Sequence, residues 1–496
     1  MAINFSYYPD SNRVPGVYVE MDPSQASAAQ TLQRSLVLGQ ITAAGTAPPL
    51  VPIEVQSLTQ VQIACGRGSM LAQMVASYLL GDNFGDLWIL PFDDNPAGQA
   101  ASGEILFAGT CTAPGTLNIY VGGVLVQTGI NLNDAAGTVA TNFAAAVNAN
   151  LDLAVTAAVG TGTAPGPETV TLTARHKGLA ANDIDIRANY YGVAGGEYTP
   201  AGITLTINAM AGGTGDPDIT PGLANLSDQT YDFIVTPYTG TSNLDAMEAF
   251  LSDYQGRWSW EQMLYGGAFA AYRGTLGALT AFGTARNDQH MAVMGFDDSP
   301  DPSWVWASQI GGYCASSLRV DPGLPLQYIA TQLKAPPVQS RLDIGERNTL
   351  LYDGISTFRV NDAGAVIIER MRTTYQTNAA GAADDSYLDV ETMFGLMFVA
   401  RDLANYLLTR YSRKKLVQNG TPVLPGSNCV TPAMIQASVV AEYRVLEANG
   451  YVQNSAIFAR NIITEDAGHG LVKILAPVDL VNQLRQIAIL LQFRKS

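Results

Sequence analysis

Histidine and cysteine are scarce in this chain of 496 residues. The cysteines are Cys65, Cys111, Cys314 and Cys429. They lie far apart without a CxxC pair, so the sequence indicates neither a zinc site nor a disulfide framework, and we expect mostly buried, reduced thiols. The histidines are His176, His290 and His469. Their surroundings are unrelated and show no HExxH spacing, so we expect no metal and no cofactor.

Basic residues and long apolar runs are also few. Lysine and arginine number 27 against 43 acidic residues, which gives a formal net charge of -16. This charge argues against a nucleic-acid partner, because neutralising phosphates needs a dense basic surface. No apolar run reaches the roughly 18 residues of a membrane span, and the N-terminus lacks a basic stretch followed by an apolar one. We therefore expect a cytosolic product without direct membrane insertion or a signal peptide.

Motifs of catalytic chemistry are missing as well. Gly66-Arg67-Gly68-Ser69 lacks the third glycine of GxGxxG and the Lys-Ser/Thr of a Walker loop, which favours a turn that caps the next helix. Three acidic pairs lie in turn-rich loops, where we expect solvated carboxylates: Asp93-Asp94, Asp297-Asp298 and Asp384-Asp385. No GxSxG elbow is present. We predict no catalytic residue, and an enzyme with an α/β core and a β-rich substrate domain stays open as the alternative.

What the chain does contain is an alternation of short apolar strands and amphipathic helices. The predicted strands are Ser35–Gly39, Leu87–Leu90, Tyr231–Thr236 and His290–Gly295. The predicted helices are Ser69–Leu80, Ser242–Tyr254, Leu276–Arg286 and Trp304–Leu318. Such alternation favours a sheet packed against helices. We predict an α/β (α+β) core domain formed by two separate parts of the chain, residues 23–94 and 216–486.

Between these two core parts the composition shifts to glycine, alanine and threonine. The strands predicted here are Gly103–Ala108, Leu117–Val121, Glu168–Ala174, Asp183–Ala188 and Ile203–Asn208, with one helix at Ala136–Asn150. Segments rich in turn residues bound the region on both sides. We therefore predict that residues 95–215 form an inserted β-rich domain that faces outward.

The C-terminal third carries the clearest local signals. A hairpin is predicted from Ile355–Val360 and Ala365–Met371, because a turn sequence joins the two apolar runs. A long amphipathic helix, Leu388–Arg413, follows and ends in basic residues that suit the helix dipole. A second helix is predicted from its N-cap, Thr431, to Asn449, with proline as its first residue.

Apolar strands at both ends of the chain are its most unusual feature. The residues that define them are Val17, Tyr18, Val19 and Met21 near the N-terminus, and Ile487, Ile489, Leu491 and Phe493 near the C-terminus. Terminal residues of a chain are ordinarily loosely ordered. We therefore expect residues 1–22 and 487–496 to be arms whose strands pair with other chains.

Five segments of the core occur in a recognisable order. They are Gly66–Ala72, Arg347–Thr357, Glu369–Tyr375, Tyr387–Val390 and Pro477–Gln486. Together they resemble the contractile tail sheath proteins of Mu-like myophages. The resemblance implies a structural subunit, not an enzyme, that polymerises as stacked hexameric rings around a tail tube and contracts to drive the tube through the host envelope. A tailocin sheath or a type VI secretion sheath is the alternative within the same class.

The resemblance also implies particular contacts. In this family the terminal arms exchange strands with neighbouring subunits, which assigns that role to the eight arm residues above. Basic residues that could face the tube are Arg410, Arg413, Lys414 and Lys415, or Arg444 and Arg485; ordinary solvated helix ends are an equally open interpretation. The implied partners are further copies of this chain, the tail tube protein, and baseplate and tail terminator proteins. The implied location is the virion tail, after assembly in the host cytoplasm.

Overall fold

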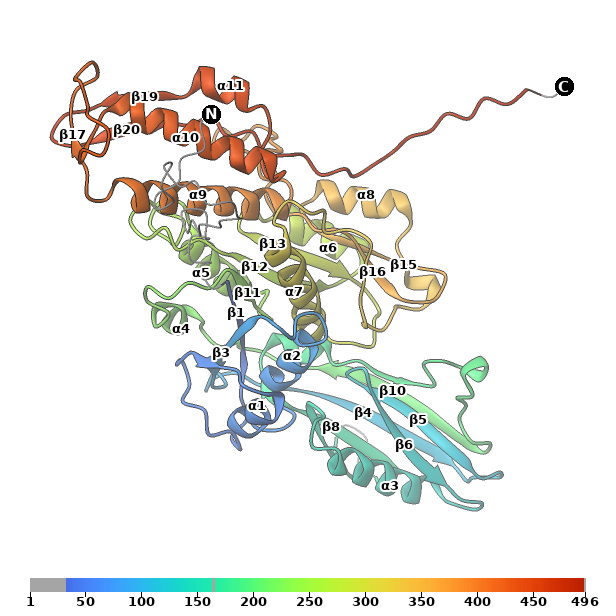
Figure 1. Ribbon diagram of the computed structural model, residues 1–496. Coiled ribbons are helices and arrows are strands. Elements are labelled where there is room, and N and C mark those ends of the chain that lie inside the picture. The colour runs from blue at the N-terminus through green and yellow to red at the C-terminus, as the bar shows by residue number, and fades with distance from the viewer. Residues whose placement is uncertain (1–32, 163–165, 495–496) are drawn as a thin grey trace, which may run out of the picture.

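The computed structural model describes residues 33–162 and 166–494. The predicted N-terminal arm, with Val17, Tyr18, Val19 and Met21, lies outside the described residues. Figure 1 shows a central sheet with its helices, a β-rich part at one end and a helical part at the other, from which the C-terminal segment projects.

A six-stranded sheet forms the centre, in the order β13-β12-β11-β1-β3-β2. Its strands are β1 (Arg34–Gln40), β2 (Ile53–Glu54), β3 (Asp86–Phe92), β11 (Phe233–Val235), β12 (Gly267–Arg273) and β13 (Met291–Phe296). Neighbouring strands pair in parallel except β2, which is antiparallel at one edge. Consecutive residues of β1 and β13 are buried, as expected where both faces of a parallel sheet are covered.

Helices cover both faces of this sheet. They are α1 (Leu58–Cys65), α2 (Met70–Tyr78), α4 (Thr220–Ala224), α5 (Thr241–Leu251), α6 (Leu276–Thr284) and α7 (Ser303–Val320). Helices α2 and α7 share a core with Val37 and Val235, whereas α4, α5 and α6 share one with Leu36 and Ile234. Neighbouring residues of each strand therefore point into separate hydrophobic clusters on the two faces of the sheet. This arrangement of sheet and helices confirms the predicted α/β fold class.

The segment before α2 is a helix-capping turn, as predicted. Gly66 and Gly68 adopt φ angles of 85° and 75°, which only glycine tolerates easily. The Ser69 side chain then accepts a hydrogen bond of 3.1 Å from the backbone N–H of Ala72. The geometry of this segment is therefore accounted for by capping of α2, without a phosphate-binding role.

Residues 100–211 form two antiparallel sheets that share one helix, α3 (Ala136–Ala149). One sheet has the order β10-β4-β8-β7 and the other β6-β5-β9. The strands are β4 (Ala100–Gly109), β5 (Gly115–Val121), β6 (Val124–Ile130), β7 (Val155–Val159), β8 (Thr169–Lys177), β9 (Ile186–Ala188) and β10 (Ile203–Ala211). The strand predicted at Asp183–Ala188 is shorter in the structure, where β9 is Ile186–Ala188. Its predicted first residue, Asp183, instead ends a 3-10 turn, Leu179–Asp183.

Polar and aromatic contacts join this β-rich part to the core. Arg187 pairs with Asp298 at 2.9 Å, and the Tyr190 hydroxyl donates a hydrogen bond of 2.7 Å to a backbone carbonyl of the core. His176 packs edge-on against Trp304 of α7, with ring centroids 5.1 Å apart. Burial lowers the pKa of His176 to about 4, so the ring is neutral near pH 7.

The C-terminal third adds short strands and long helices to the core. The strands are β14 (Ile329–Ala330), β15 (Thr357–Val360), β16 (Val366–Arg370), β17 (Lys415–Leu416), β18 (Cys429–Val430), β19 (Ile463–Asp466) and β20 (Val472–Leu475). The helices are α8 (Ile344–Tyr352), α9 (Val390–Tyr411), α10 (Pro432–Ala448) and α11 (Ser455–Asn461). The predicted hairpin is β15–β16, and the two predicted helices are α9 and α10, with Thr431 as the N-cap of α10.

Helix α9 is attached to the central sheet by the stacking of Phe394 on two rings, Phe233 and Phe269, and by one ion pair. Phe394 stacks on Phe233 of β11 with ring centroids 5.1 Å apart. About two turns further on, Arg401 binds both carboxylate oxygens of Asp232, at 2.7 and 2.8 Å. Asp232 is fully buried just before β11, so α9 is held against the sheet by a desolvated charge pair.

Candidate assembly site

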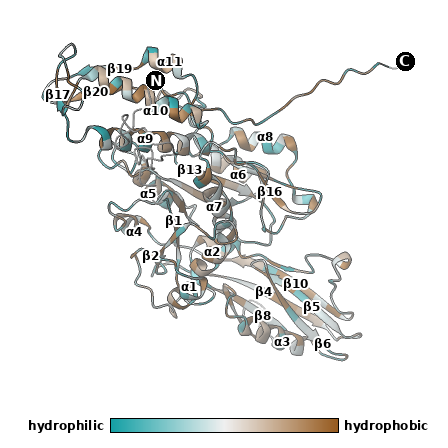
Figure 2. Ribbon diagram, viewed as in Figure 1, coloured by the Kyte–Doolittle hydropathy of each residue, from teal (hydrophilic) through white to brown (hydrophobic). Residues whose placement is uncertain are grey.

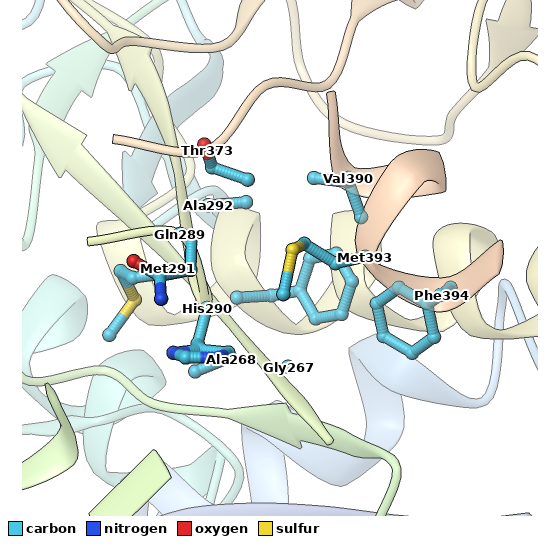
Figure 3. A pocket seen from close by; sticks show the side chains of 11 residues that line it. Gly267, Ala268, Gln289, His290, Met291, Ala292, Thr373, Val390, Met393 and Phe394 are labelled. Atoms are coloured by element: carbon cyan, nitrogen blue, oxygen red, sulfur yellow. The ribbon is translucent and has the colours of Figure 1, made fainter. Parts of the chain in front are cut away.

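A cavity between β12, β13 and the start of α9 is shown in Figure 3. Its volume is about 10 Å³, room for about one water molecule, and its lining is mostly apolar, including Met393 and Phe394. His290 borders it, with Nε2 3.1 Å from Asp253 and Nδ1 3.4 Å from Asp288. Burial opposes protonation of His290, but the two carboxylates outweigh it and raise the pKa of the ring. The cavity is a packing gap beside an ion-paired histidine.

Residues 33–162 and 166–494 contain no group of three or more His, Cys, Asp or Glu side chains placed to hold a metal ion. In the same part of the chain, no helix combines the length and apolarity needed to cross a membrane. The four cysteines are free thiols, and burial raises the pKa of Cys65 to about 12, so this thiol stays protonated.

The C-terminal segment leaves the body of the subunit as an extended arm (Figure 1). Its apolar face is exposed: Ile487 by 75%, Ile489 by 76%, Leu491 by 85% and Phe493 by 89%. Figure 2 shows hydrophobic residues along this isolated stretch. Among the described residues none pairs with 487–494 in a β-ladder. The strand predicted here is therefore not formed within the single chain, because it has no neighbouring strand.

The segment that leads to the arm is hydrogen-bonded to the subunit up to residue 484. Val452 and Leu480 form an antiparallel bridge, and the backbone N–H of Gln453 donates to Asp479 at 2.9 Å. The Gln327 side chain then donates to the backbone carbonyl of Leu484 at 2.9 Å. Contacts with the subunit thus extend to Leu484, three residues before the exposed apolar strand begins at Ile487.

Arg485, the next residue along the chain, makes the next contact with the body. Its Nη2 atom lies 2.9 Å from Oε1 of Glu391 and 3.3 Å from Oδ1 of Asp389, both at the start of α9. The Arg485 side chain is only 14% exposed. Its charge is therefore engaged within the subunit, which does not suit the tube-facing role suggested for it from the sequence.

The other five suggested tube-facing cations are exposed. Arg410, Arg413, Lys414 and Lys415 gather at the C-terminal end of α9, and Arg444 lies on α10. Arg410 lies over the Tyr406 ring, 5.7 Å from its centroid, and Lys414 donates to the backbone of Ser427 at 3.4 Å. These contacts leave the charges at the surface, where a partner can reach them.

The hairpin β19–β20 is a two-stranded sheet with an open edge on each strand. Ile463 and Leu475 face each other across it and are 59% and 63% exposed. Within the part of the chain that the structure describes, no third strand pairs with either edge. Figure 1 shows that the arm runs away from this hairpin, so the arm and the hairpin of one chain do not meet.

A family sequence model described as the phage tail sheath protein central domain matches residues 212–374. Over 497 residues the chain is 34% identical to the Mu-like prophage FluMu tail sheath protein of Haemophilus influenzae, an alignment that covers 99% of this chain and 100% of that protein. The chain belongs to the phage tail sheath family.

Two solved sheath structures also align with this sheath protein. The sheath tail protein of Desulfitobacterium hafniense shares 13% identity at a TM-score of 0.48, covering 95% of this chain and 97% of that chain. The contracted helical sheath of the anti-feeding prophage shares 12% identity at a TM-score of 0.47, covering 98% and 100%.

Membership of the family confirms the resemblance seen in the sequence. This sheath protein is a structural subunit of a phage tail sheath, placed in the tail of the virion, and it is not an enzyme. The alternative of an α/β enzyme is thereby excluded. The assembly roles assigned to individual arm and surface residues stay predictions.

Sequence analysis missed two features of this site. One is the hairpin β19–β20, whose turn Gly468-His469-Gly470 has positive φ at all three residues and is a readable turn signal between two short apolar runs. The other is the pairing of Arg485 with Glu391. These residues lie 94 positions apart, and no local pattern relates them.

Proposed function

We propose that this sheath protein polymerises into stacked hexameric rings around the tail tube, and that its terminal arms link the rings. The exposed apolar arm at residues 487–494, which has no strand partner in the described chain, is the observation that carries the proposal. A strand with this much exposed apolar surface gains most by pairing with an open sheet edge of another copy.

The hairpin β19–β20 is the proposed acceptor. It offers one free edge on each strand, which matches the two arms of the sequence: Ile487, Ile489, Leu491 and Phe493 in one, and Val17, Tyr18, Val19 and Met21 in the other. A strand added to one edge forms about five main-chain hydrogen bonds worth about 1 kcal/mol each. Burial of the apolar arm face adds to this, so each junction is strong without being covalent.

Contraction in this proposal is a rigid-body rearrangement of subunits. The arms stay paired while the side-chain interfaces between subunits repack, and the energy is stored when the sheath assembles. The tail tube, the baseplate and the tail terminator are the proposed partners, and assembly takes place in the host cytoplasm. The β-rich part, residues 95–215, lies at the opposite end of the subunit from the arm (Figure 1), which supports an outward-facing position in the tail.

The exposed cations at the end of α9 are the proposed tube-facing groups, because they are concentrated in one place on an acidic protein. Replacing Arg410 and Lys414 by glutamate is expected to leave empty sheaths intact and to weaken assembly around tubes by about twofold to fivefold per charge. Co-sedimentation with purified tubes measures this. Arg359→Glu, a change at another exposed arginine, is the control. Equal tube binding by both variants would leave these cations as solvated helix ends.

The proposed polymerisation is tested by negative-stain electron microscopy of the purified chain over a range of concentrations. Rings or tubes are expected above a critical concentration, because arm pairing between copies depends on mass action. A monomer that persists at every concentration would overturn the proposal for this chain while leaving its family membership intact.

A further inference from the structure

The junction between the subunit body and the exposed arm contains a compact ion cluster, which we call the arm clasp. It consists of Arg485, which lies between the anchored segment and the arm, and of Glu391 and Asp389 at the start of α9. Glu391 is 1% exposed, so its charge is withdrawn from water. The clasp is thus a buried contact at the exact residue where the arm becomes free of the subunit.

Both carboxylates of the clasp are themselves fixed in position. Asp389 receives a two-pronged contact from Arg370 of β16, at 2.8 and 2.9 Å. Glu391 accepts a hydrogen bond of 2.5 Å from the backbone N–H of Leu326. Because β16, α9 and the loop at Leu326 all belong to the packed body, Arg485 is held by a rigid frame.

Beyond Arg485, the described residues of the arm make no hydrogen bond and no ion pair with the body. The direction of the arm is therefore set at this residue. We propose that Arg485 is a positioning residue for sheath assembly: the clasp fixes where and in which direction the arm leaves the subunit, so that the strand at residues 487–494 is aimed at a neighbouring copy before it binds. This inference rests on the proposed strand exchange.

The physical advantage of the clasp is preorganisation. An arm released at Arg485 would sample many more orientations, and the cost of ordering these residues would then fall on the binding step. Releasing one or two more residues is expected to raise the critical concentration for polymerisation by about tenfold or more. The folded body would be unaffected, because the arm itself adds nothing to its core.

A plain stabilising ion pair is the competing explanation, and polymerisation of full-length variants separates the two. Trypsin first tests, on the monomer, whether the clasp holds Arg485 in place. Trypsin must draw an arginine side chain into its own pocket, so it cleaves after the exposed Arg494 quickly and after the clasped Arg485 slowly. Glu391→Gln keeps the volume and the hydrogen bond from Leu326 but removes the charge. Cleavage after Arg485 is expected to become about tenfold faster, by the loss of about one charged hydrogen bond, while cleavage after Arg494 stays unchanged.

Polymerisation is then compared among full-length variants by sedimentation. The double variant Arg485→Gln, Glu391→Gln avoids leaving an unpaired buried charge, and it is expected to melt like the wild type but to polymerise only at a higher concentration. Arg485→Lys should recover part of the loss, and Arg494→Gln is the matched control with no loss. An unchanged critical concentration in the double variant, with normal wild-type tubes, would overturn the clasp and leave the proposed function standing. A wild type without tubes would instead contradict the proposed function.

Discussion

Deletion of residues 487–496 is expected to leave a folded subunit that no longer polymerises. The described residues 487–494 are exposed and make no backbone hydrogen bond to the body, so the melting temperature should stay within about 1 °C of the wild type. Each lost junction removes about five hydrogen bonds and the burial of several large apolar side chains, which lowers pairwise association by about a thousandfold or more. Analytical ultracentrifugation and thermal unfolding measure the two results together.

Substitutions within a full-length arm distinguish the loss of strand pairing from any effect of shortening the chain. Ile489→Lys with Leu491→Lys places two charges on the face that should be buried in the neighbour, and polymerisation should fail as in the deletion. Gln492→Ser, in the same strand but on the other face, should polymerise normally. Tubes of ordinary length from the deletion would contradict strand exchange through this arm.

Local signals in the sequence were enough to predict the core and several of its boundaries. The N-cap at Thr431 and the following proline located the start of α10, since both act within one helical turn. The alternation of short apolar strands with amphipathic helices predicted a sheet packed against helices, and the structure adds that helices cover both of its faces. Local patterns were therefore sufficient for features that depend on the residues of one helix or one strand alone.

Features that depend on distant residues could not be read in this way. The apolar alternation at residues 487–496 predicted a strand, but a strand needs a partner edge, and the described single chain supplies none to residues 487–494. Within the β-rich part, β6 was missed because glycine and threonine weaken its alternating pattern. Arg485 was suggested as one of the cations that could face the tube, whereas in the structure its side chain pairs with Glu391, 94 positions away, and is only 14% exposed.

Breaking the ion pair between α9 and the central sheet is the second large effect that we expect. Arg401→Met leaves the fully buried carboxylate of Asp232 without its bidentate partner, which should lower the free energy of unfolding by about 3 kcal/mol. Arg257, whose charge also interacts with Asp232, keeps the loss at the lower end of the usual range. Urea unfolding monitored by circular dichroism measures the change.

Two controls show whether burial is the cause of this loss. Combining Arg401→Met with Asp232→Asn removes the unpaired charge and should recover part of the lost stability. Arg67→Ala breaks the exposed pair with Asp152, whose side chains are 51% and 45% exposed, and should lower stability far less than Arg401→Met does. If Arg401→Met cost no more than Arg67→Ala, the pair would not hold α9 to the sheet. Helix α9 carries Glu391 near its start, and the exposed cations lie at its C-terminal end. The attachment of α9 therefore also determines where the clasp and these cations lie relative to the core.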